Sequence, residues 1–135
     1  MMPDLDPRED AMQATGRRFT AALSKRDFNS LQAIFHPDVR SRLLIPSRLV
    51  TPLDAKGVID NYREWFGEAD FFEMRQVDVG CIGRRLHIYY QILLQDADGW
   101  SVLEQHAFGN LENGRIKRFD LICSGFEPAP ALKGG

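Results

Sequence analysis

The dipeptide Asn113-Gly114 constrains the fold of this chain more than any other short segment. Asn-Gly is the strongest short-range signal for a two-residue β-hairpin turn, because both residues tolerate the positive φ angles that such a turn requires. Two runs with strand character, residues 100–111 and 115–123, flank the dipeptide. The C-terminal part of the chain is therefore predicted to contain a long antiparallel hairpin, whose register decides which side chains share a face.

Helices are expected before the strands. Apolar residues recur at helical spacing near the N-terminus, and Asp27 is a typical residue to cap a second helix. That helix is expected to end at His36-Pro37, because the residue before a proline disfavours the helical conformation. The expected elements in chain order are helices over residues 9–25 and 28–35, strands over 39–44 and 48–53, a helix over 54–67, and strands over 71–81, 84–95, 100–111 and 115–123. This order predicts an α+β fold in which three N-terminal helices pack on one face of a curved antiparallel sheet.

Length and composition indicate a single globular domain. The chain has 135 residues, of which 44% are hydrophobic and 27% charged, and we expect one domain over residues 1–135 with an ordered core over residues 9–126. The net charge of −2 predicts no binding of nucleic acid. No apolar run reaches the roughly 18 residues of a membrane span, and the N-terminus does not resemble a signal peptide, so we expect a cytoplasmic protein. Cys81 and Cys123 lack metal-ligand spacing and are expected to be reduced core residues.

The register of the hairpin predicts which polar residues share a face. With a two-residue turn, His106 lies opposite Leu121 and Glu104 lies opposite Cys123. An even-length loop at Asp98-Gly99 then brings five residues to one face: His87, Tyr89, Gln91, Glu104 and His106. The other face carries the apolar series Leu86, Ile88, Tyr90, Ile92 and Leu94. The residues alone support two interpretations equally, a polar stripe facing solvent or a polar stripe lining a pocket.

The chain resembles the NTF2-like superfamily, and in particular its SnoaL-like and ketosteroid-isomerase-like members. The resemblance rests on the order of the elements, on Phe-His-Pro-Asp-Val at residues 35–39 and on Glu-Asn-Gly-Arg-Ile at residues 112–116, and it covers about residues 11–126. It implies a cystatin-like cone, in which the sheet curls round the helices and leaves a largely apolar pocket open at one end. It also implies a homodimer formed through the outer face of the sheet.

The same resemblance implies that His106 faces the pocket. In ketosteroid isomerases a protonated aspartate stands eight residues before the glycine of the last hairpin and donates a hydrogen bond to the developing enolate; His106 stands at that position here. The general base and the tyrosine of the isomerase are absent, because Leu43 and Phe19 occupy the matching positions. Steroid isomerisation by that route is therefore not expected.

Two further family patterns involve the last strands. SnoaL-type cyclases use an aspartate that follows an aromatic residue, and Phe119-Asp120 resembles this pair. Asp120 would belong to the pocket if a three-residue turn with a bulge shifted the register and placed it opposite His106; otherwise it lies on the outer face beside an arginine. His87, His106 and Tyr89 resemble in kind the scytalone-dehydratase-like set of two histidines and tyrosines.

The expected function is the binding of a small, largely apolar organic molecule in the cone, with neither metal nor cofactor. If a reaction occurs, we expect proton transfer next to a carbonyl: isomerisation, dehydration or cyclisation. His106 would move the proton, oriented by Glu104. Tyr89 and His87 would polarise the carbonyl, with Asp120 assisting. The alternative is a non-catalytic module that binds a ligand or a partner protein. The other residues expected to line the pocket are Phe19, Leu43, Tyr62, Trp65, Gln91, Phe108, Phe119, Leu121 and Cys123.

Overall fold

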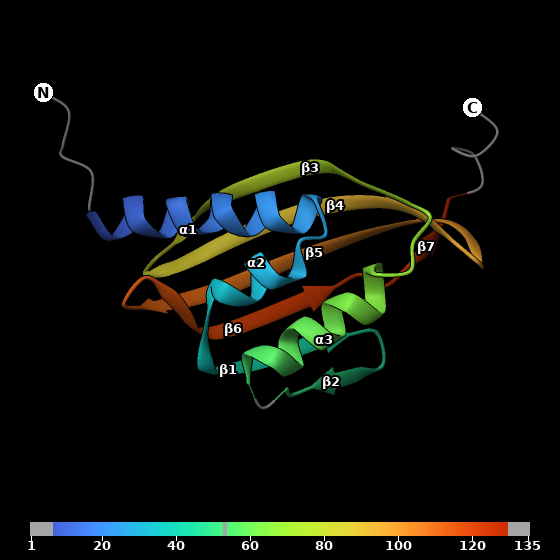
Figure 1. Ribbon diagram of the computed structural model, residues 1–135. Coiled ribbons are helices and arrows are strands. Elements are labelled where there is room, and N and C mark those ends of the chain that lie inside the picture. Colours follow the sequence, from blue (N-terminus) through green and yellow to red (C-terminus); the bar gives the residue numbers. More distant parts are fainter. Residues whose placement is uncertain (1–6, 53, 130–135) are drawn as a thin grey trace, which may run out of the picture.

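The computed structural model describes residues 7–52 and 54–129, and its elements follow the predicted order (Figure 1). Residues 1–6 and 130–135, all outside the expected ordered core, and Leu53, at the end of a predicted strand, lie outside the described residues. The second helix is shorter than expected, because a strand already begins at Phe35 and includes His36-Pro37. The elements are α1 (Pro7–Ser24), α2 (Phe28–Ala33), β1 (Phe35–Ile45), β2 (Arg48–Val50), α3 (Ala55–Phe66), β3 (Phe71–Ile82), β4 (Arg85–Asp96), β5 (Gly99–Glu112), β6 (Arg115–Cys123) and β7 (Glu127–Pro128).

Local chemistry sets the ends of the short helices and the last turn. Asp27 caps α2 by accepting a hydrogen bond from the backbone N–H of Ser30, and Asp54 caps α3 in the same way. Asn113 and Gly114 have φ angles of 52° and 80°, as a two-residue hairpin turn requires. The cap predicted at Asp27 and the turn predicted at Asn113-Gly114 are therefore confirmed.

The sheet is mixed rather than wholly antiparallel, which corrects the expectation from the sequence. The strand order is β2-β1-β6-β5-β4-β3, and β7 pairs with β5 outside this path. All the pairings along the path are antiparallel except that of β1 with β6, which is parallel. The reason is topological: after β2 the chain crosses through α3 to the far edge and then returns strand by strand, so that β6 arrives beside β1.

The helices cover one face of the sheet. In Figure 1, α1 runs along β3 and β4, whereas α3 lies beside β1. Gly16 lets α1 approach closely, because a Cβ atom there would lie 2.4 Å from Cγ1 of Val79. We call the covered side the inner face; on β4 it consists of Leu86, Ile88, Tyr90, Ile92 and Leu94, all buried. The opposite side is the outer face; on β4 it carries His87, Tyr89 and Gln91.

The register between β5 and β6 differs from the prediction by one residue. The turn does have two residues, since Glu112 lies opposite Arg115. The register then shifts beyond Leu111, because the two strands contain unequal numbers of residues there and β6 bulges around Lys117. As a result His106 lies opposite Ile122 rather than Leu121, and Cys123 lies opposite Gln105 rather than Glu104.

Candidate functional site

The predicted polar stripe exists, but it lies on the outer face. Tyr89 pairs with His106 and Gln91 pairs with Glu104, so the five residues share a face as predicted. The expectation that this face lines a pocket beneath the helices is wrong, because the helices bury the opposite, apolar face. Burial of apolar area is the dominant favourable term in folding, so the alternate apolar residues of β4 decide which face turns inward.

Two imidazoles meet at the centre of the outer face. His87 Nε2 and His106 Nδ1 are 2.9 Å apart, and the two rings are stacked at an interplanar angle of 11°. The ring of Phe108 stacks against His87 on the neighbouring strand. Partial burial lowers the pKa of His87 and the adjacent His106 lowers it further, while Asp78 opposes the change. The pair is thus a hydrogen-bonded, surface-facing contact.

Asp120 lies on the same outer face, but arginines hold it. The bulge places Asp120 opposite Phe108, not opposite His106 as the shifted register had predicted. Arg42 Nε and Arg85 Nη2 each lie 2.8 Å from its carboxylate, and Arg118 lies at 3.4 Å. Burial alone would raise the pKa of Asp120, yet hydrogen bonds from Arg42 and Arg85 outweigh it and the pKa is lowered. The carboxylate is therefore an ion-pair partner that stabilises the sheet.

The inner face holds a buried polar group that the sequence analysis did not identify. Tyr62 of α3, Tyr90 of β4 and Gln105 of β5 are all fully or almost fully buried. Tyr90 donates its hydroxyl proton to Oε1 of Gln105, so the contact of 2.9 Å between the two hydroxyls must use the proton of Tyr62. Burial raises the pKa of both tyrosines. The signal for this network in the sequence was that Tyr90 and Gln105 occupy inward-facing positions of β4 and β5, where most of the other side chains are apolar.

The other predicted lining residues form the hydrophobic core or lie on the outer face. The ring of Phe19 contacts the rings of Tyr62, Tyr90 and Phe119, so aromatic side chains fill this region. Trp65 is half-buried against Tyr62. The members of the set that belong to the core or pack against it are Phe19, Leu43, Tyr62, Trp65, Phe119, Leu121 and Cys123. The two on the outer face are Gln91 and Phe108.

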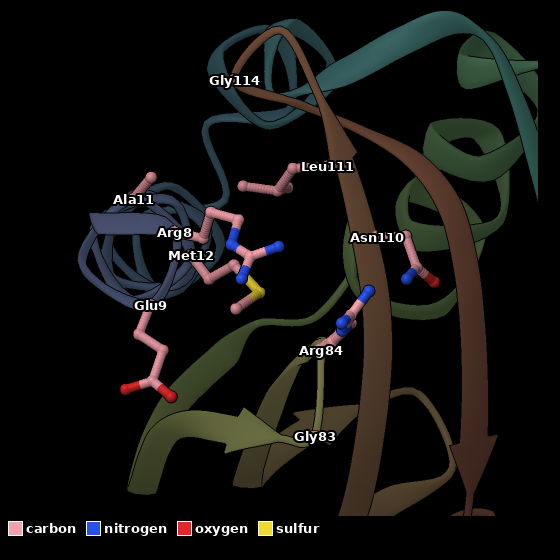
Figure 2. A pocket seen from close by; sticks show the side chains of 9 residues that line it. All are labelled: Arg8, Glu9, Ala11, Met12, Gly83, Arg84, Asn110, Leu111 and Gly114. Atoms are coloured by element: carbon pink, nitrogen blue, oxygen red, sulfur yellow. The ribbon is translucent and has the colours of Figure 1, made fainter. Parts of the chain in front are cut away.

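A cavity of about 230 Å³ lies between the first turns of α1 and the ends of two hairpins (Figure 2). Met12 of α1 and Leu111 of β5 give it apolar walls. Arg84, in the turn between β3 and β4, and Asn110 of β5 add polar groups, and Arg8 of α1 points into it. None of these residues was predicted to belong to a site, because segments far apart in the sequence form the cavity only after α1 packs on the sheet.

The described ranges, 7–52 and 54–129, contain neither a cluster of metal ligands nor a membrane-spanning helix. Within them, histidine, cysteine, aspartate and glutamate side chains form no group of three or more that is arranged to hold a metal ion. None of the helices there combines the length and the hydropathy that crossing a membrane requires.

Comparison with known proteins identifies the fold. No protein-family model matches the chain, and no curated protein matches its sequence. Among solved structures, the chain is similar to an NTF2-like protein of unknown function from Burkholderia pseudomallei, with 20% identity, a TM-score of 0.66 and coverage of 91% of this chain and 95% of that one. It is also similar to an LEH-like epoxide hydrolase from M. tuberculosis, with 15% identity, a TM-score of 0.67 and coverage of 87% and 86%. AusH from Aspergillus nidulans is similar as well, with 15% identity, a TM-score of 0.65 and coverage of 86% of this chain and 85% of that one.

These similarities define an α+β protein with a curved sheet wrapped against helices. The chain has the NTF2-like fold, as the order of its elements predicted. At this level of sequence identity the comparisons establish the fold, and the site has to be judged from the chain's own residues.

Proposed function

We propose that this protein binds a small, largely apolar organic molecule in the cavity between α1 and the hairpin ends. The observation that carries the proposal is the cavity itself, which combines apolar walls from Met12 and Leu111 with a few polar groups at its rim. Small-molecule sites typically have this composition. The volume of about 230 Å³ lies below the common range of about 300–1,000 Å³, which favours a compact ligand.

The proposed role is binding without catalysis. A general acid or base must reach the proton that it transfers, within about 3 Å or through one water molecule. His106, which was predicted to move the proton, lies on the outer face, as do His87 and Tyr89, which were predicted to polarise the carbonyl. The carboxylate of Asp120 is paired with arginines. The second interpretation offered by the sequence, a ligand-binding module, is therefore the better supported one. One neighbour in fold is an epoxide hydrolase, whose name implies a small-molecule substrate.

The proposal is tested by titrating isotope-labelled protein with 2-phenylethanol, phenylacetamide and phenylacetate and following the backbone amide signals by NMR. We expect saturable shifts centred on Met12, Leu111 and Gly114, which line the cavity. Leu111→Trp should fill the cavity and weaken binding about tenfold or more, because a filled site has lost the apolar surface that the ligand covers.

The matched control is Leu44→Trp, which places the same ring on the exposed outer face and should leave the affinity unchanged. A dispersed spectrum confirms that each variant is folded. Shifts that miss the cavity with all three compounds, or shifts that persist undiminished in Leu111→Trp, would overturn the proposal.

A further inference from the structure

The cavity presents hydrogen-bond donors to a ligand, and this allows the class of ligand to be narrowed. Arg84 is the last residue of the turn before β4 and Arg85 is the first residue of the strand, yet their guanidinium groups have different surroundings. Arg85 is on the outer face, where it donates to Asn110 Oδ1 at 2.9 Å and to Asp120 Oδ2 at 2.8 Å. Arg84 lines the cavity and, among the described residues, forms no hydrogen bond or ion pair.

The contact with Arg85 also fixes the orientation of the Asn110 amide. A guanidinium can only donate, so the amide oxygen of Asn110 must be the atom that faces Arg85. The amide NH₂ group of Asn110 therefore points away from Arg85. In Figure 2 the amide nitrogen of Asn110 lies on the side of Arg84 and the oxygen on the side away from it. Arg84 and Asn110 both line the cavity, and each carries N–H groups that form no hydrogen bond within the described residues.

The charged side chains that line the cavity also favour an anionic ligand. Among the described residues that line the cavity, Arg8 and Arg84 are positively charged and Glu9 is the one carboxylate. Guanidinium groups match the planar, two-oxygen geometry of a carboxylate and bind it with paired hydrogen bonds. Met12 and Leu111 provide apolar contact for the rest of such a molecule.

We infer that the ligand of this cavity is a small carboxylate with an apolar body, whose carboxylate group is bound by Arg84 and by the amide NH₂ of Asn110. The inference rests on the proposed function, because it names the ligand class of the same site. It requires that a carboxylate bind more tightly than a neutral molecule of the same shape, since only the carboxylate has two acceptor oxygens and a charge to offset the guanidinium.

The test compares phenylacetate with phenylacetamide, which differ in one group, by NMR titration and calorimetry of the full chain. We expect phenylacetate to bind at least tenfold more tightly, and Arg84→Gln to remove that preference. Asn110→Asp is the sharper variant, because it keeps an acceptor for Arg85 but replaces the NH₂ donors with a second negative charge. It should weaken phenylacetate binding and leave phenylacetamide binding within about twofold. Arg75→Gln, at an exposed site on β3, is the control for the loss of one positive charge and should change neither affinity.

The outcomes separate the two proposals. Equal binding of the acid and the amide in the cavity, or a preference for the acid that survives both Arg84→Gln and Asn110→Asp, overturns the carboxylate inference and leaves the binding function intact. Absence of shifts at the cavity with both compounds overturns the carboxylate inference, and the same absence with 2-phenylethanol overturns the binding function as well. Loss of phenylacetate affinity in Arg75→Gln to the same extent as in Arg84→Gln also overturns the inference, because the net charge of the chain would then account for it.

Discussion

Two consecutive tyrosines of β4 show how differently the two faces of the sheet use the same side chain. Tyr90 points to the inner face, is fully buried and shares hydrogen bonds with Tyr62 and Gln105. Tyr89 points to the outer face, where its ring lies 4.8 Å from that of His106 and its hydroxyl donates to Gln76 at a longer 3.3 Å. Strand alternation alone separates the two environments. The polar side chains that were predicted to be catalytic lie on the outer face, whereas the polar side chains that are shielded from water lie on the inner face.

The largest predicted difference between the faces concerns aromatic packing. Phe119→Ala removes a fully buried ring that contacts Phe19 and Phe35. It should lower the free energy of unfolding by about 3–5 kcal/mol, because it loses buried apolar area and leaves a cavity. Phe108→Ala, on the outer face, should cost about 1 kcal/mol or less. Urea denaturation followed by circular dichroism measures both; equal losses would contradict the assignment of the faces.

The buried hydrogen bonds should have an intermediate effect. Tyr90→Phe keeps the ring but leaves Oε1 of Gln105 and the hydroxyl of Tyr62 without their shared partner. Leaving buried polar groups unsatisfied should cost about 1–3 kcal/mol in the free energy of unfolding. Tyr89→Phe removes the same atom one residue away and should change the free energy by less than about 0.5 kcal/mol, as is usual for surface positions. Chemical denaturation of this pair isolates the network, and an equal response of the two variants would show that the network adds no stability.

The sequence predicted the elements and the sharing of faces well, because both depend on local chemistry. The cap at Asp27, the Asn113-Gly114 turn and the two-residue period of the strands are short-range signals, and each holds in the structure. The residues alone left open whether the polar stripe faces solvent or a pocket, and in the structure the apolar residues of β4 are the ones that turn inward under the helices. The resemblance to ketosteroid isomerases led to the opposite choice, because it assigned the pocket to His106 by its distance from a glycine.

Two features could not be predicted from the sequence and became visible only in the folded chain. The bulge around Lys117 has no distinctive residue to mark it, yet it moves Asp120 to the face of His106 and into contact with Arg42 and Arg85. The cavity depends on how α1 packs against the hairpin ends, which no local pattern specifies. The homodimer expected through the outer face stays a prediction; that face exposes Leu44 and Ile122, each at 48%.

The smallest predicted effect concerns the arginines around Asp120 on the outer face. Asp120→Asn should lower the free energy of unfolding at neutral pH by about 1 kcal/mol, because partly exposed ion pairs contribute little. The pKa of Asp120 is below its ordinary value of 3.8 in the folded protein, so the native state favours the ionised form. The stabilisation is therefore complete above the unfolded pKa and is lost as the pH falls through the lower, folded pKa.

The difference in unfolding free energy between Asp120→Asn and the unaltered chain should accordingly be present at pH 7 and shrink below about pH 3. Asp38→Asn, which changes an exposed carboxylate on β1, serves as the control for the loss of one negative charge. Urea denaturation of the three proteins at both pH values provides the measurement. A difference that stays constant down to the acid limit would mean that Asp120 contributes through packing or neutral hydrogen bonds, and the outer face would then resemble the inner face more than the two tyrosines suggest.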